Sequence, residues 1–193
     1  MSLVESDLHY SSTEPRGNNR HRFPVTDHLL RNGCRRVVFI GLPDSAPTVM
    51  VRASGYSDAV CAAGLPPAVE IGSPSSPEWV SGIFRQHKAD GFVCANDRTA
   101  GQLMLTLNAL GIEIPTQVKI VGIDDVKYAS LLHVPLTTLQ QPCNDIGAAA
   151  VSTMIDRITH PNMPPREVQL NCKLVIRKSC GSPSSDSGSD QRL

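Results

Sequence analysis

The stretch from residue 90 to residue 110 constrains the fold of this chain more than any other. It opens with a short apolar run, 91–95, of the kind that forms a buried parallel strand. The run ends at Asn96 and Asp97, whose side-chain oxygens can cap a following helix, and that helix is predicted by leucines at helical spacing, Leu103, Leu107 and Leu110. A strand that feeds a helix in this way places the polar pair at the carboxyl edge of a parallel sheet, where ligands bind.

Apolar runs and helical segments alternate along much of the chain. Short, mostly β-branched runs predict strands at 37–41, 69–71, 91–95 and 118–123, and helical patterns separate them at 51–64, 78–87 and 97–110. Further helices are expected at 25–32 and 144–159, and a final strand within 168–177. This alternation predicts an α/β fold, a parallel sheet flanked by helices on both faces. We expect residues 1–22 to be an irregular lead-in and residues 182–193 a disordered tail, because both are polar and rich in turn residues.

Composition excludes several classes of protein. The formal net charge is zero, whereas a free-standing nucleic-acid-binding domain normally carries a basic surplus. No secretory signal and no run of membrane-spanning length is present, so we expect a cytoplasmic protein that does not contact a membrane. The six cysteines form no CxxC pair and no metal-ligand spacing, which favours reduced thiols and no metal site.

Polar residues follow three of the predicted strands. Asp44 and Ser45, with Arg52 nearby, follow the first, Asn96-Asp97 the third, and Asp124-Asp125 the fourth, with Gln140-Gln141 further along. Carboxyl ends of parallel strands share one edge, so these side chains should converge there. Arginine, amide and carboxylate groups together suit a small ligand rich in hydroxyl groups, such as a sugar. The alternative is that the pairs only cap helices and shape turns.

A catalytic role finds little support in the sequence. Paired aspartates could hold Mg²⁺ or act as acid and base, but no nucleophile motif, phosphate-binding loop or HExxH motif accompanies them. We therefore predict no catalytic residue, no cofactor and no enzyme activity.

Several motifs in order resemble the effector-binding domain of the lactose/galactose repressor (LacI/GalR) family of transcriptional regulators. The resemblance runs from about residue 18 to residue 179 and is carried by DHLL at 27–30, RRVVFIG at 35–41, RASGY at 52–56, CANDRTA at 94–100, IP at 114–115, VKIVGIDD at 118–125, PLTTLQQP at 135–142 and LVIRKS at 174–179. It implies a type I periplasmic-binding-protein-like fold, in which two α/β subdomains enclose a small effector, usually a sugar.

The resemblance also implies roles for particular residues. Arg52 matches the arginine that grips ligand hydroxyls, Asn96 the asparagine of the cleft, Asp124 the first acid of the strand-end pair, and Gln141 a cleft-lining position. Trp79 matches an aromatic residue that stacks on the ligand, although a packing role in the core is an equal alternative.

The family pattern divides the chain into parts and implies its partners. Residues 23–135 match the C-terminal effector-binding subdomain, 136–165 a crossover and helix that belong to the other subdomain, and 166–181 the final strand. The helix-turn-helix head and most of the first subdomain have no counterpart here, so DNA contact is expected only through a head that this sequence lacks. The helix at 144–159 should then expose its apolar stripe, and we expect a homodimer. The alternatives are a periplasmic sugar-binding protein of a transporter and an enzyme of a doubly wound class.

Overall fold

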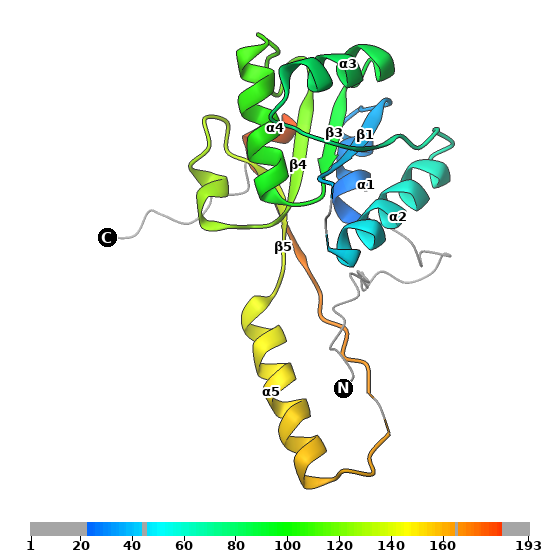
Figure 1. Cartoon of the computed structure of the whole chain (residues 1–193), viewed down its shortest axis with the longest axis vertical. Coiled ribbons are helices and arrows are strands. Elements are labelled where there is room, and N and C mark those ends of the chain that lie inside the picture. The colour runs from blue at the N-terminus through cyan, green and yellow to red at the C-terminus, as the bar shows by residue number, and fades with distance from the viewer. Residues whose placement is uncertain (1–22, 44–45, 165, 183–193) are drawn as a thin grey trace.

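The computed structural model describes residues 23–43, 46–164 and 166–182. They form a six-stranded sheet in the order β2-β1-β3-β4-β5-β6 (Figure 1). The strands are β1 Val37–Gly41, β2 Val69–Ile71, β3 Gly91–Cys94, β4 Lys119–Asp124, β5 Thr137–Gln140 and β6 Lys173–Val175. The first five are parallel; the sequence predicts β1 to β4 among them but not β5, and β6 runs antiparallel to β5. The predicted lead-in and residues 183–193 of the predicted tail lie outside the described residues.

Helices cover both faces of the sheet because side chains of each strand alternate between them. Phe39 faces the apolar cluster that α1 and α2 complete, and its neighbours Val38 and Ile40 face the cluster completed by α3 and α4. The helices are α1 Pro24–Arg31, α2 Pro47–Ala62, α3 Pro77–His87, α4 Asp97–Ala109 and α5 Cys143–Thr159, with 3-10 turns η1 Lys127–Ser130 and η2 Lys178–Cys180. The structure therefore confirms the predicted α/β architecture with a mostly parallel sheet.

The start of α2 differs from the prediction. The sequence predicts a helix from residue 51, but α2 begins at Pro47. Proline is favoured at the first helical position, where its missing N–H has no intrahelical partner and its fixed φ suits the helix. The earlier start adds a turn that brings Thr48 and Val49 to the edge of the sheet where the predicted site lies.

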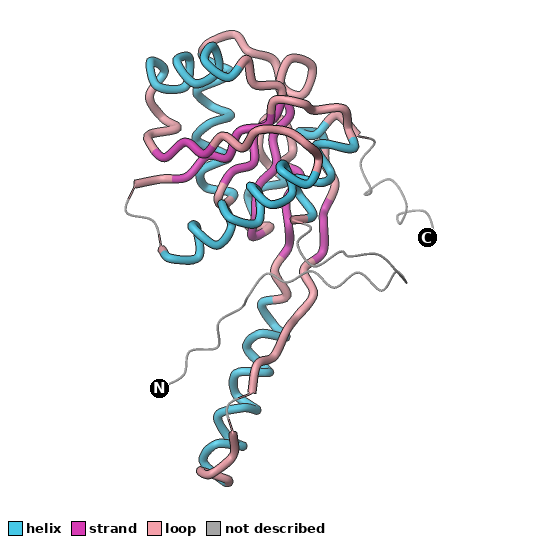
Figure 2. The backbone as a smooth tube through the Cα atoms, turned by 90° about the vertical axis from the view of Figure 1, so that its right-hand side faces the viewer, coloured by secondary structure: helices cyan, strands magenta, loops and turns pink. Residues whose placement is uncertain are grey.

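Beyond β4 the chain leaves the sheet and returns to it. Strand β5 pairs with β4, so the sheet continues to Gln140, past the boundary predicted at residue 135. Helix α5 then projects from the sheet, and an extended segment leads back to β6 (Figures 1 and 2). No residue of α5 is buried, and Met154 and Ile158 of its predicted apolar stripe are exposed. In the described segments, no helix combines the length and the apolar character needed to cross a bilayer.

Candidate functional site

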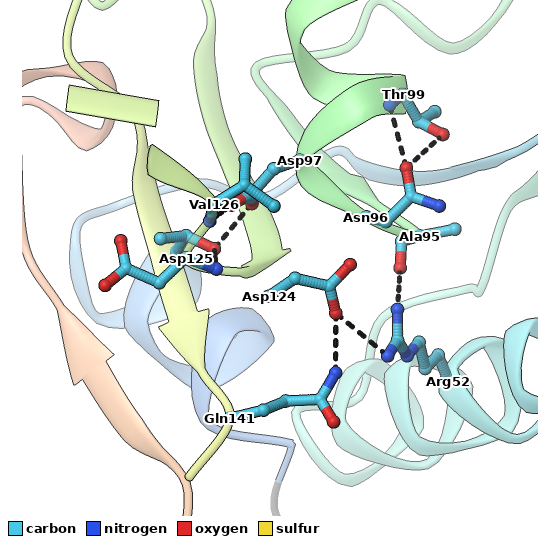
Figure 3. A network of polar contacts seen from close by, with 10 residues as sticks. Arg52, Ala95, Asn96, Asp97, Thr99, Asp124, Asp125, Val126 and Gln141 are labelled. Atoms are coloured by element: carbon cyan, nitrogen blue, oxygen red, sulfur yellow. Dashed lines mark hydrogen bonds and ion pairs between the residues drawn. The ribbon is translucent and has the colours of Figure 1, made fainter. Parts of the chain in front are cut away.

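Four of the five predicted site residues line one cavity of about 780 Å³ at the carboxyl edge of the sheet. Arg52 comes from α2, Asn96 from the end of β3, Asp124 from the end of β4, and Gln141 from the segment after β5 (Figure 3). The remaining lining residues are Ala46, Thr48, Val49, Asp125, Val126, Lys127 and Cys143. The predicted convergence of strand ends is therefore observed for these four residues, whereas Asp44 and Ser45 lie outside the described residues.

Arg52 is fixed by two partners, one directly after β3 and one at the end of β4. Its Nη1 donates a hydrogen bond of 2.6 Å to the carbonyl oxygen of Ala95, and its Nη2 lies 3.1 Å from Oδ1 of Asp124 (Figure 3). Only 10% of the Arg52 side chain is exposed, so the guanidinium is largely removed from water. A charge-assisted pair in this setting is stronger than one on the surface and holds the arginine in one orientation.

Asp124 is held at the centre of the cavity wall. Its Oδ1 accepts hydrogen bonds from Arg52 and from Nε2 of Gln141, the latter at 2.6 Å. The backbone of Asp124 has φ 118° and that of Asp125 φ 54°, a region that side-chain-bearing residues rarely adopt. Such strain is found where the surrounding structure holds a side chain in a particular direction, and it recurs at ligand sites.

Asn96 both caps a helix and lines the cavity. Its Oδ1 accepts hydrogen bonds from the backbone N–H of Thr99 at 2.8 Å and from the Thr99 hydroxyl at 2.9 Å, so Asn96 is the N-cap of α4. The predicted helix cap at Asn96 is therefore present. The cap uses only the amide oxygen, however, and the Nδ2 donors of Asn96 remain for the cavity that it lines.

Asp97 is hydrogen-bonded to the loop after β4 but does not line the cavity. It is fully buried, its Oδ1 accepts a 2.6 Å hydrogen bond from the Thr138 hydroxyl, and its Oδ2 accepts a 2.9 Å bond from the backbone N–H of Val126. Burial raises the pKa of Asp97 from 3.8 to about 6, although its two hydrogen bonds act in the opposite direction. The nearby carboxylates of Asp124 and Asp125 raise it further. Asp97 is thus a structural residue rather than a ligand contact.

The raised pKa of Asp97 predicts a pH dependence of stability. A carboxyl group that binds its proton more tightly in the folded state contributes stability that is complete below about pH 4 and is lost as the pH rises through about 6. The free energy of unfolding is therefore expected to fall by about 3 kcal/mol as Asp97 loses its proton. It can be measured by urea unfolding of the parent and Asp97→Asn between pH 4 and 8. The difference in unfolding free energy between the two proteins should change across this range; a constant difference would contradict the assignment.

The two carboxylates at the end of β4 are unsuited to a metal ion. Asp124 pairs with Arg52, and Asp125 pairs with Arg177 at 2.8 Å and accepts a 2.8 Å hydrogen bond from Gln140. Both negative charges are therefore neutralised by arginine. Within the described ranges there is no group of three or more histidine, cysteine, aspartate or glutamate side chains arranged to hold a metal ion.

Trp79 lies away from the other predicted site residues. It belongs to the first turn of α3 and packs, half-buried, against the apolar cluster on that face of the sheet. Gly72 allows this packing, because a Cβ at residue 72 would lie 2.3 Å from the indole ring. The structure thus does not bring Trp79 to the cavity, and its contacts are those of a packing residue.

Six lining residues were not predicted from the sequence, and three of them, Thr48, Lys127 and Cys143, carry a polar or thiol side chain. Thr48 and Cys143 lie in the first turns of α2 and α5, and Lys127 begins η1, directly after the loop that follows β4. Lys127 follows Asp124 by only three residues, and this short separation could have indicated that Lys127 lies at the same edge of the sheet. Thr48 could not be placed without the true start of α2.

Comparison with known proteins relates this geometry to a family. Residues 26–180 match the model of the periplasmic binding protein-like domain. The ribose operon repressor of Escherichia coli (strain K12) is 29% identical over 162 residues, which cover 80% of this chain and 49% of that protein. The HTH-type transcriptional regulator CelR of Thermobifida fusca is 26% identical over 186 residues, which cover 93% of this chain and 54% of CelR.

A solved structure shows the same relationship in three dimensions. The complex of the transcriptional regulator CelR with cellobiose matches with a TM-score of 0.70 and 26% identity, covering 80% of this chain and 49% of that one. The chain spans about half the length of the curated relatives it matches. This chain therefore belongs to the periplasmic binding protein-like domain family, and it corresponds to the C-terminal effector-binding region of LacI-family regulators.

Proposed function

We propose that this chain binds a small effector of the carbohydrate class in the cavity lined by Arg52, Asn96, Asp124 and Gln141. The observation that carries the proposal is the set of polar atoms left for a ligand. Nδ2 of Asn96, Oδ2 of Asp124 and Oε1 of Gln141 form no hydrogen bond with another described residue. A hydroxyl group both donates and accepts, so a polyhydroxylated ligand can satisfy all three.

The balance of charge supports a neutral ligand. The ion pair of Arg52 with Asp124 leaves little net charge at the centre of the cavity wall. The volume of about 780 Å³ falls within the usual range for small-molecule sites, about 300–1,000 Å³.

In this proposal the chain is the effector-sensing part of a LacI-type transcriptional regulator. The relatives named above are regulators, and one of them has been solved with cellobiose, which supports this function over that of a transporter's periplasmic sugar-binding protein. A ligand that bridges the cavity wall to a facing subdomain would shift the population of closed and open forms. That shift would alter DNA binding by a helix-turn-helix head, in the cytoplasm.

We also propose that the chain forms homodimers. Two large apolar side chains are highly exposed: Leu105 within α4 is 70% exposed, and Leu131 directly after η1 is 82% exposed. Beside them lies a mainly apolar groove of about 390 Å³ between α4 and the segment 132–134. Exposed apolar surface of this kind favours burial against a second copy of the same chain.

The experiment that tests effector binding is calorimetric titration of the chain with a panel of neutral sugars that includes ribose and cellobiose. We expect one class of sugar to bind with one site per chain. Asn96→Ser should weaken that binding about tenfold or more, because serine keeps the helix cap but lacks the amide donors.

The stability of Asn96→Ser is checked by urea unfolding. The urea concentration at the midpoint should stay close to that of the parent, because serine and asparagine are comparable N-caps. Full affinity in a folded Asn96→Ser protein would remove Asn96 from the site. Absence of heat with every sugar at millimolar concentration would count against the proposed function itself.

A further inference from the structure

Two cysteines lie where the two segments that lead to and from α5 leave the sheet. Strands β5 and β6 are antiparallel, and Gln140 lies opposite Lys173. The next step of the same register sets Gln141 against Cys172. Cys143 follows Gln141 by two residues and is the first residue of α5, so it lies just past the point where the two segments pair.

A tight turn keeps Cys143 close to this pair of segments. Pro142 has φ −78° and ψ 66°, and the backbone N–H of Cys143 donates a 2.9 Å hydrogen bond to the carbonyl oxygen of Gln141. These are the features of an inverse γ-turn, which shortens the chain relative to a strand. Besides burial, the charge of Cys143 raises the pKa of Cys172, which indicates that the two thiols are near each other. A disulfide needs Cα atoms about 4.4–6.8 Å apart, so the two segments must come within that separation for the bond to form.

Accessibility distinguishes these two thiols from most of the others. Cys34, Cys94 and Cys180 are buried, whereas Cys143 is exposed and Cys172 is half-buried. Cys143 also lines the cavity. Burial raises the pKa of Cys172, while Arg52 lowers it and the nearby Cys143 and Asp124 raise it, so Cys172 lies in the electrostatic environment of the same cavity. The remaining exposed thiol is Cys61 on α2.

We propose that Cys143 and Cys172 form a disulfide when the chain reacts with a hydroperoxide, and that this bond ties together the two segments that connect the sheet to α5. The exposed Cys143 reacts first: its thiolate attacks the terminal peroxide oxygen, the O–O bond breaks, and the alkoxide takes up a proton and leaves as an alcohol. The resulting sulfenic acid is then attacked by the Cys172 thiolate. The S–O bond breaks, hydroxide leaves and is protonated to water, and the two thiols have given two electrons to the peroxide.

The test is oxidation of the full chain with hydrogen peroxide, followed by alkylation of the remaining thiols and tryptic mapping without reduction. The sequence places Cys143 in the fragment 128–157, Cys172 in 167–173 and Cys61 in 53–85, so each pairing gives a distinct mass. We expect a linked species of 128–157 with 167–173 that disappears on reduction. Cys143→Ser and Cys172→Ser should each lose it, and Cys61→Ser should keep it.

Oxidation of the unfolded chain tests whether the pairing of Cys143 with Cys172 depends on the folded structure. The same oxidation in concentrated urea, where β5 and β6 no longer pair, should give much less of this linked species. Equal yields in the folded and unfolded chain would overturn the proposal. So would recovery of the Cys143 fragment from the folded parent only as sulfinic acid or only linked to the Cys61 fragment. These readouts require no effector, so they are independent of whether the chain binds a sugar.

Discussion

The Gly122→Ala variant is expected to be about 3–5 kcal/mol less stable than the parent chain. Gly122 lies in β4, and a Cβ added there would stand 2.2 Å from Oδ1 of Asp97 and 3.0 Å from Cδ2 of Leu136. Because both neighbours are fully buried, neither can move into solvent. Displacing Asp97 would break its hydrogen bonds with Thr138 and Val126, leaving buried polar groups without partners. Urea unfolding followed by circular dichroism measures the loss.

Gly82→Ala is the matched control for this variant. Gly82 lies inside α3, and a Cβ there would meet no heavy atom within 4 Å other than the adjoining backbone of its own helix. Alanine is the better helix former, so this change should stabilise the chain by about 0.5–1 kcal/mol. If the unfolding free energy of Gly122→Ala fell by less than about 1 kcal/mol, the Asp97 carboxylate would not lie against Gly122.

Arg52→Met is expected to reduce affinity for the effector about a hundredfold or more. Methionine preserves much of the buried stem of the side chain but removes the guanidinium that joins the carbonyl of Ala95 to Asp124. Loss of one partner from such a pair typically costs about 2–5 kcal/mol, since the remaining charge is left unpaired. The Asp124 carboxylate would then lose one of the two side chains that orient it. Calorimetry with the sugar identified for the parent gives the affinity.

Arg98→Met controls for the loss of a positive charge. Arg98 is exposed in the first turn of α4, two residues beyond Asn96, and it is not a lining residue of the cavity. Its replacement should leave affinity within about twofold of the parent. Similar losses in both variants would show that the general charge of this region, rather than the Arg52–Asp124 pair, governs binding.

The sequence predicts well those features that depend on local patterns. Apolar runs located four of the five parallel strands, and the polar residues near their ends predicted the meeting of Arg52, Asn96 and Asp124. The LacI-type motifs assigned Gln141 to the cleft, and it reaches Asp124 from beyond β5. The role of each residue as an effector ligand stays a prediction.

Features that depend on distant contacts could not be predicted. Asp97 is positioned by Thr138, 41 residues away, so the sequence could not show the geometry of its anchoring. The antiparallel direction of β6 follows from the path of the chain around α5, which no short pattern encodes. The packing role of Trp79 could not be predicted either. An aromatic residue at the start of a helix has the same local pattern whether it packs on a core or faces a ligand.

The exposed helix α5 has a consequence for the motions of the molecule. It has 17 residues, only slightly more than the about 12–15 at which isolated helices are marginal in water, and it contains Gly147. With no buried side chain and few contacts to the return segment, α5 gains little stability from packing. We therefore expect α5 to open and re-form as a separate cooperative unit, at a free-energy cost far below that of unfolding the sheet. Its amide protons would exchange with solvent through these local openings.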